Sequence, residues 1–168
     1  NESKYAITVF NTLDFVRSGY VEINAYGGLK GNCLKDENGK FIPVQKFENG
    51  YIGFIADSIP ANGFRNFSLT EIQIKLNMND SLPFSFRLDS ASGCISQLNY
   101  MNQNLIDQSK FKGLMQPVYV EGLDVTKYVT GKAIHIEQIG FGPVVKSWRI
   151  VSMLQGCDSI ITEISTYS

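Results

Sequence analysis

The feature that most constrains the fold of this chain is a two-residue alternation of apolar and polar side chains. In "FSFRL" (84–88), Phe84, Phe86 and Leu88 share one face, and Ser85 and Arg87 share the other. This period is typical of a half-buried β-strand, because successive side chains of a strand point to opposite faces of its sheet. The same alternation occurs in "VEINAY" (21–26), "EIQIKL" (71–76) and "AIHIEQI" (133–139).

The alternation also predicts which side chains face a core. The residues predicted to face inward in these three segments are Val21, Ile23, Ala25, Ile72, Ile74, Leu76, Ile134 and Ile136. His135 and Glu137 are predicted to face outward, as neighbours of inward-facing residues on a strand.

Turn sequences separate the strands at short intervals. They are "DENGK" (36–40), "FENGY" (47–51), "IPANGF" (59–64), "SASGC" (90–94) and "FGPV" (141–144). Asn and Gly tolerate the positive φ angles that hairpin turns require. An α/β fold would need amphipathic helices of about ten residues or more, and only "LNYMNQNLIDQSKF" (98–111) has room for a helical turn. The sequence therefore predicts an all-β protein, with a domain boundary near residue 70.

Composition narrows the classes of function. The 168 residues carry a formal net charge of -1, so no basic field is available for nucleic acid or anionic lipid, and neither partner is expected. No apolar run approaches the roughly 20 residues that span a bilayer. Cys33, Cys94 and Cys157 are widely spaced and predict buried or half-buried free thiols, with one disulfide left open. Asn1 suggests a processed product or a piece of a longer protein.

Few residues suit catalysis. With His135 as the only histidine, the chain has no two-histidine zinc site, and a Ser-His-Asp triad would depend on this one outward-facing residue. Glycoside hydrolysis needs two carboxylates, one of them with a raised pKa. The candidates are Asp14, Asp57, Asp89, Asp107, Glu121 and Asp124, and each also has a structural explanation in a turn or at a strand edge.

Two further features bear on function. Trp148, in "VKSWRI" (145–150), is a candidate sugar-stacking residue, although aromatic residues on strands are more often part of a core. In "VFNTLDFVRSGYVEI" (9–23), Asn11 and Asp14 are predicted to satisfy backbone N–H groups at a corner. Arg17 is predicted to pair with Asp14 or with a carbonyl group.

Several segments together resemble the C-terminal β-region of glycoside hydrolase family 38 alpha-mannosidases. They are "VFNTLDFVRSGYVEI" (9–23), "NGKFIPVQ" (38–45), "FIADSIPANGFRNFSL" (54–69), "FRLDSASGCISQLNYMNQNLID" (86–107) and "GPVVKSWRI" (142–150). Their order and spacing are similar to the family pattern over essentially the whole chain.

The resemblance implies a small immunoglobulin-like β-sandwich over residues 1–70. Residues 71–168 would then form the first part of a galactose-mutarotase-like supersandwich that continues beyond the chain. It further implies that the parent is a retaining, zinc-dependent alpha-mannosidase. Its aspartate nucleophile and metal ligands would lie in an N-terminal catalytic domain outside this chain, so no catalytic, cofactor-binding or metal-binding residue is assigned here.

Three hypotheses follow. The chain is a noncatalytic β-region that supports the catalytic domain and the rim of its sugar cleft, with mannose-containing glycans as ligands of the parent. Alternatively, it is a stand-alone carbohydrate-binding module that uses Trp148 or surface tyrosines, or a mutarotase-like enzyme that uses His135 and Glu137. We also expect self-association through an exposed edge strand that carries Ile160, Ile161 and Ile164.

Overall fold

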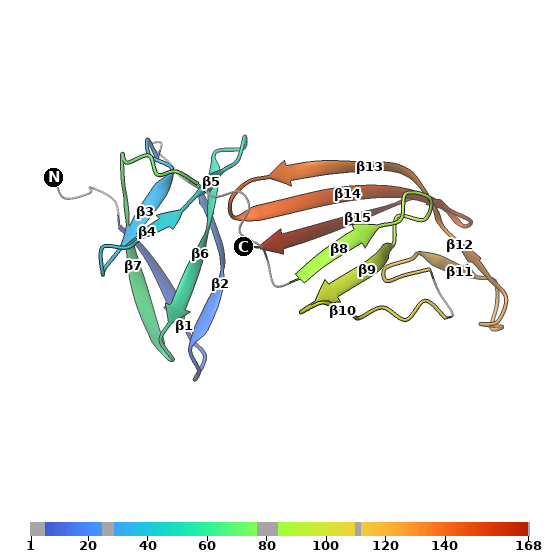
Figure 1. The fold of residues 1–168 in the computed structure, drawn as a ribbon. Coiled ribbons are helices and arrows are strands. Elements are labelled where there is room, and N and C mark those ends of the chain that lie inside the picture. Colours follow the sequence, from blue (N-terminus) through green and yellow to red (C-terminus); the bar gives the residue numbers. More distant parts are fainter. Residues whose placement is uncertain (1–5, 25–28, 77–83, 110–111, 168) are drawn as a thin grey trace. The chain divides into compact units, whose positions relative to one another are not determined.

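A computed structural model describes residues 6–24, 29–76, 84–109 and 112–167 (Figure 1). These residues form fifteen β-strands in antiparallel sheets and no helix, which confirms the all-β prediction. Accordingly, within the described ranges there is no helix long and apolar enough to cross a membrane. The chain divides into two compact units.

Unit 1 consists of the described residues of Asn1–Asn79, Gly142–Lys146 and Thr166–Ser168. Two sheets form it, one with the strand order β1-β7-β3-β4 and one with the order β2-β6-β5. The strands are β1 (Ala6–Asn11), β2 (Arg17–Asn24), β3 (Cys33–Asp36), β4 (Phe41–Pro43), β5 (Gln45–Lys46), β6 (Tyr51–Ile59) and β7 (Gly63–Leu69). The sheets enclose one apolar core, as in a β-sandwich.

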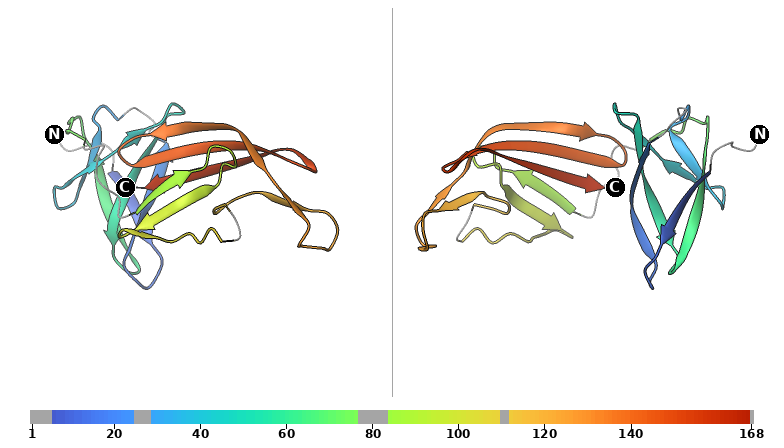
Figure 2. Two further views of the ribbon diagram at one scale, coloured as in Figure 1. Left: turned by 45° about the vertical axis from the view of Figure 1, so that its right-hand side comes forward. Right: turned by 180° about the vertical axis from the view of Figure 1, so that it is seen from behind.

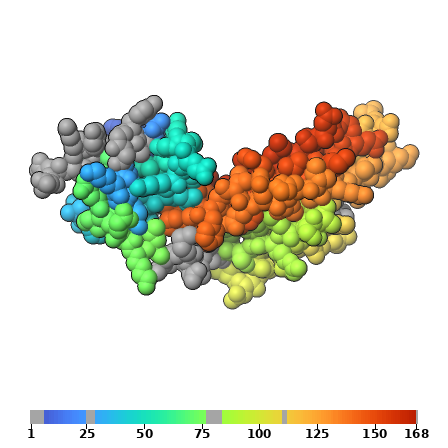
Figure 3. Space-filling model, turned by 90° about the horizontal axis from the view of Figure 1, so that it is seen from above, coloured from blue at the N-terminus to red at the C-terminus, as the bar shows by residue number. Residues whose placement is uncertain are grey.

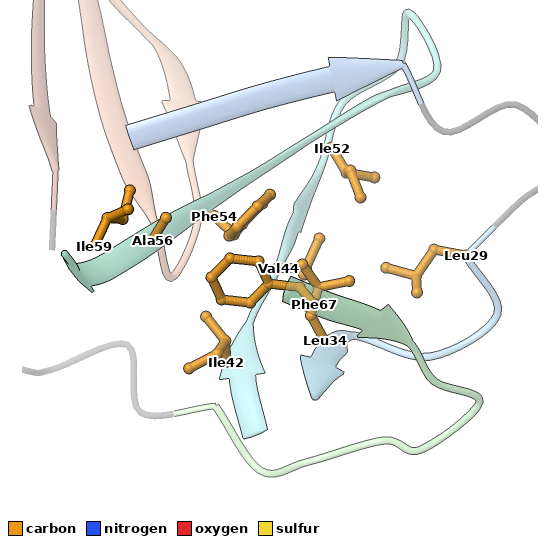
Figure 4. Packing of buried hydrophobic residues seen from close by; sticks show 9 residues of the cluster. All are labelled: Leu29, Leu34, Ile42, Val44, Ile52, Phe54, Ala56, Ile59 and Phe67. Carbon is orange, nitrogen blue, oxygen red and sulfur yellow. The ribbon is translucent and has the colours of Figure 1, made fainter. Parts of the chain in front are cut away.

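The core of unit 1 is built from alternate residues of strands in both sheets (Figure 4). Phe54 of β6 and Phe67 of β7 are fully buried, and their rings meet edge to face with centroids 5.1 Å apart. The cluster comprises Leu29, Leu34, Ile42, Val44, Ile52, Phe54, Ala56, Ile59 and Phe67. Val21 and Ile23 pack against it, as their alternation predicted, whereas Ala25 lies outside the described residues.

Asn11 holds the corner at the end of β1. Its Oδ1 accepts a hydrogen bond from the N–H of Leu13 at 3.1 Å. Its Nδ2 lies within hydrogen-bonding distance of three carbonyl oxygens: Phe15 at 2.7 Å, Pro60 at 3.0 Å and Ile59 at 3.3 Å. The corner role predicted for Asn11 is confirmed.

The roles predicted for the other two polar corner residues are wrong. The side chains of Asp14 and Arg17 form no hydrogen bond or ion pair with any described residue, and both residues are exposed. The buried side-chain amide of Asn11 bonds the backbone groups at this corner by itself.

Unit 2 consists of the described residues of Asp80–Phe141 and Ser147–Ser165. Its sheets have the strand orders β10-β9-β8, β11-β12 and β13-β14-β15, and the last three strands form a meander (Figure 2). The strands are β8 (Phe84–Leu88), β9 (Ile95–Tyr100), β10 (Gln103–Asn104), β11 (Val118–Val120), β12 (Tyr128–Thr130), β13 (Lys132–Phe141), β14 (Val145–Leu154) and β15 (Cys157–Tyr167).

Close packing in unit 2 centres on the turn between β8 and β9. Gly93 adopts a φ of +73°, and a Cβ atom at this position would lie 2.5 Å from Ile150 Cγ2. Cys94, Ile150 and Ser152 are almost fully buried beside this turn. The predicted alternation of β8 is confirmed, since Phe84, Phe86 and Leu88 are half-buried between exposed residues.

Much of the apolar surface of unit 2 remains exposed. In Figure 3 the orange and red residues of β13, β14 and β15 lie at the surface. Ile134 is 57% exposed, so it is not buried as predicted, whereas Ile136 on the same face of the strand is half-buried. β13 is an outer strand of its sheet, where side chains have strand neighbours on one flank only. In β15, Ile161 is 63% exposed, whereas Ile160 and Ile164 are half-buried.

Two segments differ from their predicted structure. Residues 71–76 form no strand. The N–H of Asn32 donates to the carbonyl of Ile72, but at Ile74 the Asn32 side chain replaces the backbone: its Oδ1 accepts from the N–H of Ile74 and its Nδ2 donates to the carbonyl of Ile74. Within 98–111, the described residues form a hairpin instead of a helical turn. Met101 and Asn102 both have positive φ, as a two-residue type I′ turn requires.

The three cysteines are free thiols. Cys33 and Cys94 are buried as predicted, whereas Cys157 is exposed because it begins β15 directly after the Gly156 turn. The predicted domain boundary near residue 70 stays a prediction.

Candidate functional site

Four of the candidate carboxylates accept hydrogen bonds in structural positions: Asp89, Asp107 and Asp124 within turns, and Asp57 between the strands β6 and β2. Asp57 accepts a hydrogen bond from the Ser18 hydroxyl, and Asp89 accepts two from Ser92. Asp107 and Asp124 accept from a hydroxyl and an N–H two residues further along the chain. These hydrogen bonds lower the pKa of all four carboxyl groups. Because a general acid in glycoside hydrolysis needs a raised pKa, the geometry favours structural roles for them.

Arg65 organises a second set of charges, which the sequence analysis did not identify. Its guanidinium contacts Asp36 Oδ2 at 2.7 Å and Glu37 Oε1 at 3.2 Å, and it donates to the carbonyl of Asp57 at 2.8 Å. Burial raises the pKa of Asp36. Hydrogen bonds from the N–H groups of Lys40 and Asn38, together with Arg65, outweigh that effect and leave this pKa lowered. The Arg65 cluster therefore joins β3 and β7 by pairing one guanidinium with two carboxylates.

His135 is a surface residue, as predicted. Its side chain is 60% exposed, and Nε2 lies 3.4 Å from Glu137 Oε2. Glu137 also lies 3.7 Å from Arg149 of β14, which contacts Glu163 of β15 at 2.8 Å. Arg149 therefore pairs with the carboxylates of Glu137 and Glu163 and links β13, β14 and β15.

Trp148 lies on β14 and is half-buried. Its ring meets that of Phe86 on β8 edge to face, with centroids 4.9 Å apart and an interplanar angle of 84°. This geometry is common for aromatic pairs in cores. Sugar contact by Trp148 stays a prediction.

A pocket of about 380 Å³ lies in unit 2, where the hairpin of β11 and β12 approaches the turn between β14 and β15. Tyr119 and Val129 are direct cross-strand partners, so their side chains share a face of the hairpin. The pocket is lined by Tyr119, Glu121, Lys127, Tyr128, Val129 and Gln155. Ligand-binding pockets commonly have volumes of about 300–1,000 Å³.

Turn chemistry shapes the wall of this pocket. Gly156 has a φ of +87°, and a Cβ atom there would lie 2.8 Å from Cε2 of Tyr119, so the tyrosine ring packs against the glycine backbone. Asp124 accepts hydrogen bonds from the N–H and hydroxyl of Thr126, and its carbonyl accepts from the N–H of Lys127. Lys127 Nζ also lies 3.5 Å from Asp124 Oδ2.

Of the pocket residues, the sequence analysis identified only Glu121. Tyr119, Lys127 and Gln155 lie in segments without a recognisable motif, and Gln155 comes 26 positions after Val129 in the sequence. The available local signals were Gly122 and Gly156, which mark turns but do not indicate that the two turns approach the same pocket.

Neither a metal site among the described residues nor a similarity to known proteins assigns a function to the chain. Within the described ranges, no three His, Cys, Asp or Glu residues gather as a metal ion would require. Comparison with models of known protein families, with curated proteins and with solved structures finds no match to this chain in any of the three.

Proposed function

We propose that this chain is a noncatalytic β-region of an alpha-mannosidase-like glycoside hydrolase, where it supports the catalytic domain and the rim of the sugar cleft. The proposal begins from the order of the family-like segments along the sequence. In it, the aspartate nucleophile and the zinc ion of a retaining alpha-mannosidase would belong to the catalytic domain, and mannose-containing glycans would be ligands of the whole enzyme.

The observation that carries the proposal is the structural role of the most distinctive of these segments. Within "VFNTLDFVRSGYVEI", Asn11 is buried and connects the corner to the end of β6 through Ile59 and Pro60. A residue with all of its amide atoms engaged in this way is suited to holding a fold and not to moving protons. Asp57 and Asp89 are likewise held by hydrogen bonds, from Ser18 and Ser92 respectively.

Exposed aromatic residues on unit 1 support a role that involves a partner domain. Phe10 of β1 and Phe64 of β7 are cross-strand partners whose ring centroids lie 5.7 Å apart. They are 69% and 52% exposed, respectively. Adjacent large apolar side chains that remain in solvent are characteristic of interaction surfaces. The catalytic domain of the same enzyme is the proposed partner.

The coding sequence upstream of Asn1 provides the first test. We expect an α/β domain with paired His and Asp metal ligands in the same reading frame. We also expect the chain described here to release no nitrophenol from 4-nitrophenyl α-D-mannopyranoside when Zn²⁺ is supplied. Turnover that scales with the amount of this chain, or an upstream frame without such a domain, would overturn the proposal.

The full reading frame provides the second test. Replacing both aromatic residues (Phe10→Ser with Phe64→Ser) should expose the domain junction to limited proteolysis and lower mannosidase activity. Phe41→Ser alters another exposed phenylalanine of unit 1 and serves as the matched control. Equal protease resistance and activity in both variants would argue against docking through this aromatic pair.

A further inference from the structure

The pocket between the β11–β12 hairpin and the β14–β15 turn has the chemistry of a ligand site. Its charged lining residues are Glu121 and Lys127, whose formal charges cancel. The side-chain amide of Gln155 and the phenol group of Tyr119 bring both hydrogen-bond donors and acceptors. A lining of this kind suits a neutral ligand with several groups that each donate and accept hydrogen bonds.

The pocket also offers an apolar surface. The Tyr119 ring packs on the backbone of Gly156 and shares a face of the hairpin with the side chain of Val129. Restricting an aromatic ring before a ligand arrives reduces the conformational entropy that binding would otherwise cost. The pocket therefore combines a packed aromatic ring with exposed polar side chains such as that of Lys127.

We propose that this pocket binds the pyranose ring of a neutral sugar, with Tyr119 as the stacking platform and with Glu121, Lys127 and Gln155 as partners of its hydroxyl groups. A pyranose presents C–H groups on one face and hydroxyl groups around its edge, which matches this division of the lining. The volume of about 380 Å³ lies in the lower part of the range for ligand pockets, as expected for a small ligand. The inference does not depend on the proposed function, because it concerns binding by unit 2 alone.

Nuclear magnetic resonance titration of the isotope-labelled chain tests the inference. The probes are methyl α-D-mannopyranoside, methyl α-D-glucopyranoside and methyl β-D-galactopyranoside, with sorbitol as an acyclic polyol. At least one pyranoside should shift the amide signals of residues 119–121, 127–129 and 155 saturably at millimolar concentration, and sorbitol should not. The absence of saturable shifts at these residues with all three pyranosides would overturn the inference.

Substitutions then assign the contacts. Tyr119→Ala should weaken binding by about tenfold or more, while Tyr119→Phe should retain most of it because the ring remains. Tyr100→Ala removes an exposed tyrosine of unit 2 outside this pocket and should leave the affinity unchanged. Gln155→Ala alters an exposed turn residue and should weaken binding by about threefold without unfolding the chain, so the inference remains testable if Tyr119→Ala misfolds.

One competing ligand chemistry needs its own probe. Aromatic rings also bind organic cations through cation–π contacts. Tetramethylammonium chloride is therefore titrated in parallel. Saturable binding of this cation with higher affinity than any of the pyranosides would overturn the assignment of the pocket to a neutral sugar, whereas tighter pyranoside binding would support it.

Discussion

Unit 1 and unit 2 are both built from β-strands, but they bury their apolar residues differently. Unit 1 encloses nine buried side chains between two sheets, and its corner groups are satisfied by Asn11 and Arg65. In unit 2, burial centres on Cys94, Ile150 and Ser152, while large apolar residues such as Ile134 and Ile161 remain exposed. The difference indicates that unit 1 has a closed core, with exposed apolar residues such as Phe10 and Phe64 outside it, whereas the buried residues of unit 2 gather beside the Gly93 turn.

Removing the centre of the unit 1 core should have the largest effect. Phe54→Ala deletes a fully buried ring that contacts Phe67, and we expect it to lower the free energy of unfolding by about 3–5 kcal/mol. Urea denaturation followed by circular dichroism measures the change. Phe41→Ala, at a partly exposed residue of the same unit, should cost much less. A loss below about 1 kcal/mol for Phe54→Ala would contradict the closed core.

Loss of the Asn11 side chain should have the second-largest effect on the free energy of unfolding. Asn11→Ala leaves buried carbonyl groups without this donor and should lower the free energy of unfolding by about 3 kcal/mol. Asn66→Ala, which removes a hydrogen bond at an exposed position, should cost about 0.5 kcal/mol or less. Equal losses in the two variants would show that Asn11 is not the residue that holds the corner.

Alanine substitutions at two glycines compare how tightly a turn is packed in each unit. Gly93→Ala in unit 2 adds both an unfavourable φ and a Cβ atom 2.5 Å from Ile150, so it should cost about 2–3 kcal/mol. Gly50→Ala in unit 1 has a φ of +82° but no neighbouring atom within 4 Å, so it should cost about 1 kcal/mol. Thermal unfolding of the two variants measures the difference, and similar costs would show that the Gly93 turn is not tightly packed.

Acid should weaken unit 1 through Asp36. The pKa of this carboxyl group is lowered from an ordinary value of 3.8, so the unfolded chain takes up a proton first as the pH falls. The contribution of Asp36 is therefore complete above about pH 4 and is lost as the pH falls through the lower folded-state pKa. Urea midpoints measured across this range should fall less steeply for Asp36→Asn than for the unsubstituted chain.

Asp14→Asn provides the control for this acid titration, because the Asp14 side chain has no hydrogen bond or ion pair with a described residue. Its urea midpoints should follow those of the unsubstituted chain at every pH. If Asp36→Asn also follows that curve, the Arg65 cluster does not contribute to the acid dependence.

The smallest effect on stability concerns the surface of unit 2. The β15 strand lies at one side of its three-stranded sheet, and we expect concentration-dependent association through it. Ile161→Lys should reduce association in sedimentation velocity with little change in unfolding, while Val125→Lys, on the β11–β12 loop, should not reduce it. A monomer at every concentration would contradict the expected association.

Local patterns predicted much of the fold. The alternation in "FSFRL" and "VEI" identified strands, and the Asn-Gly turns at Gly39 and Gly50 have the positive φ angles that the sequence indicated. The pattern failed for "EIQIKL", because Asn32, about 40 residues earlier by number, takes the hydrogen bonds that a strand ladder would have used. The alternation of apolar and polar residues describes one segment at a time, whereas a hydrogen-bonded ladder also requires a neighbouring strand.

At the candidate site, too, some features follow from the local sequence and others only from the tertiary structure. The turn roles of Asp89, Asp107 and Asp124 depend on serine or threonine residues two or three positions away, so the sequence by itself determined them. The pocket beside Tyr119 was decided only by the tertiary structure, because it requires Val129 across a hairpin and Gln155 from a distant turn. Short-range hydrogen bonds can be inferred from neighbouring residues, but a pocket depends on where separate strands come together.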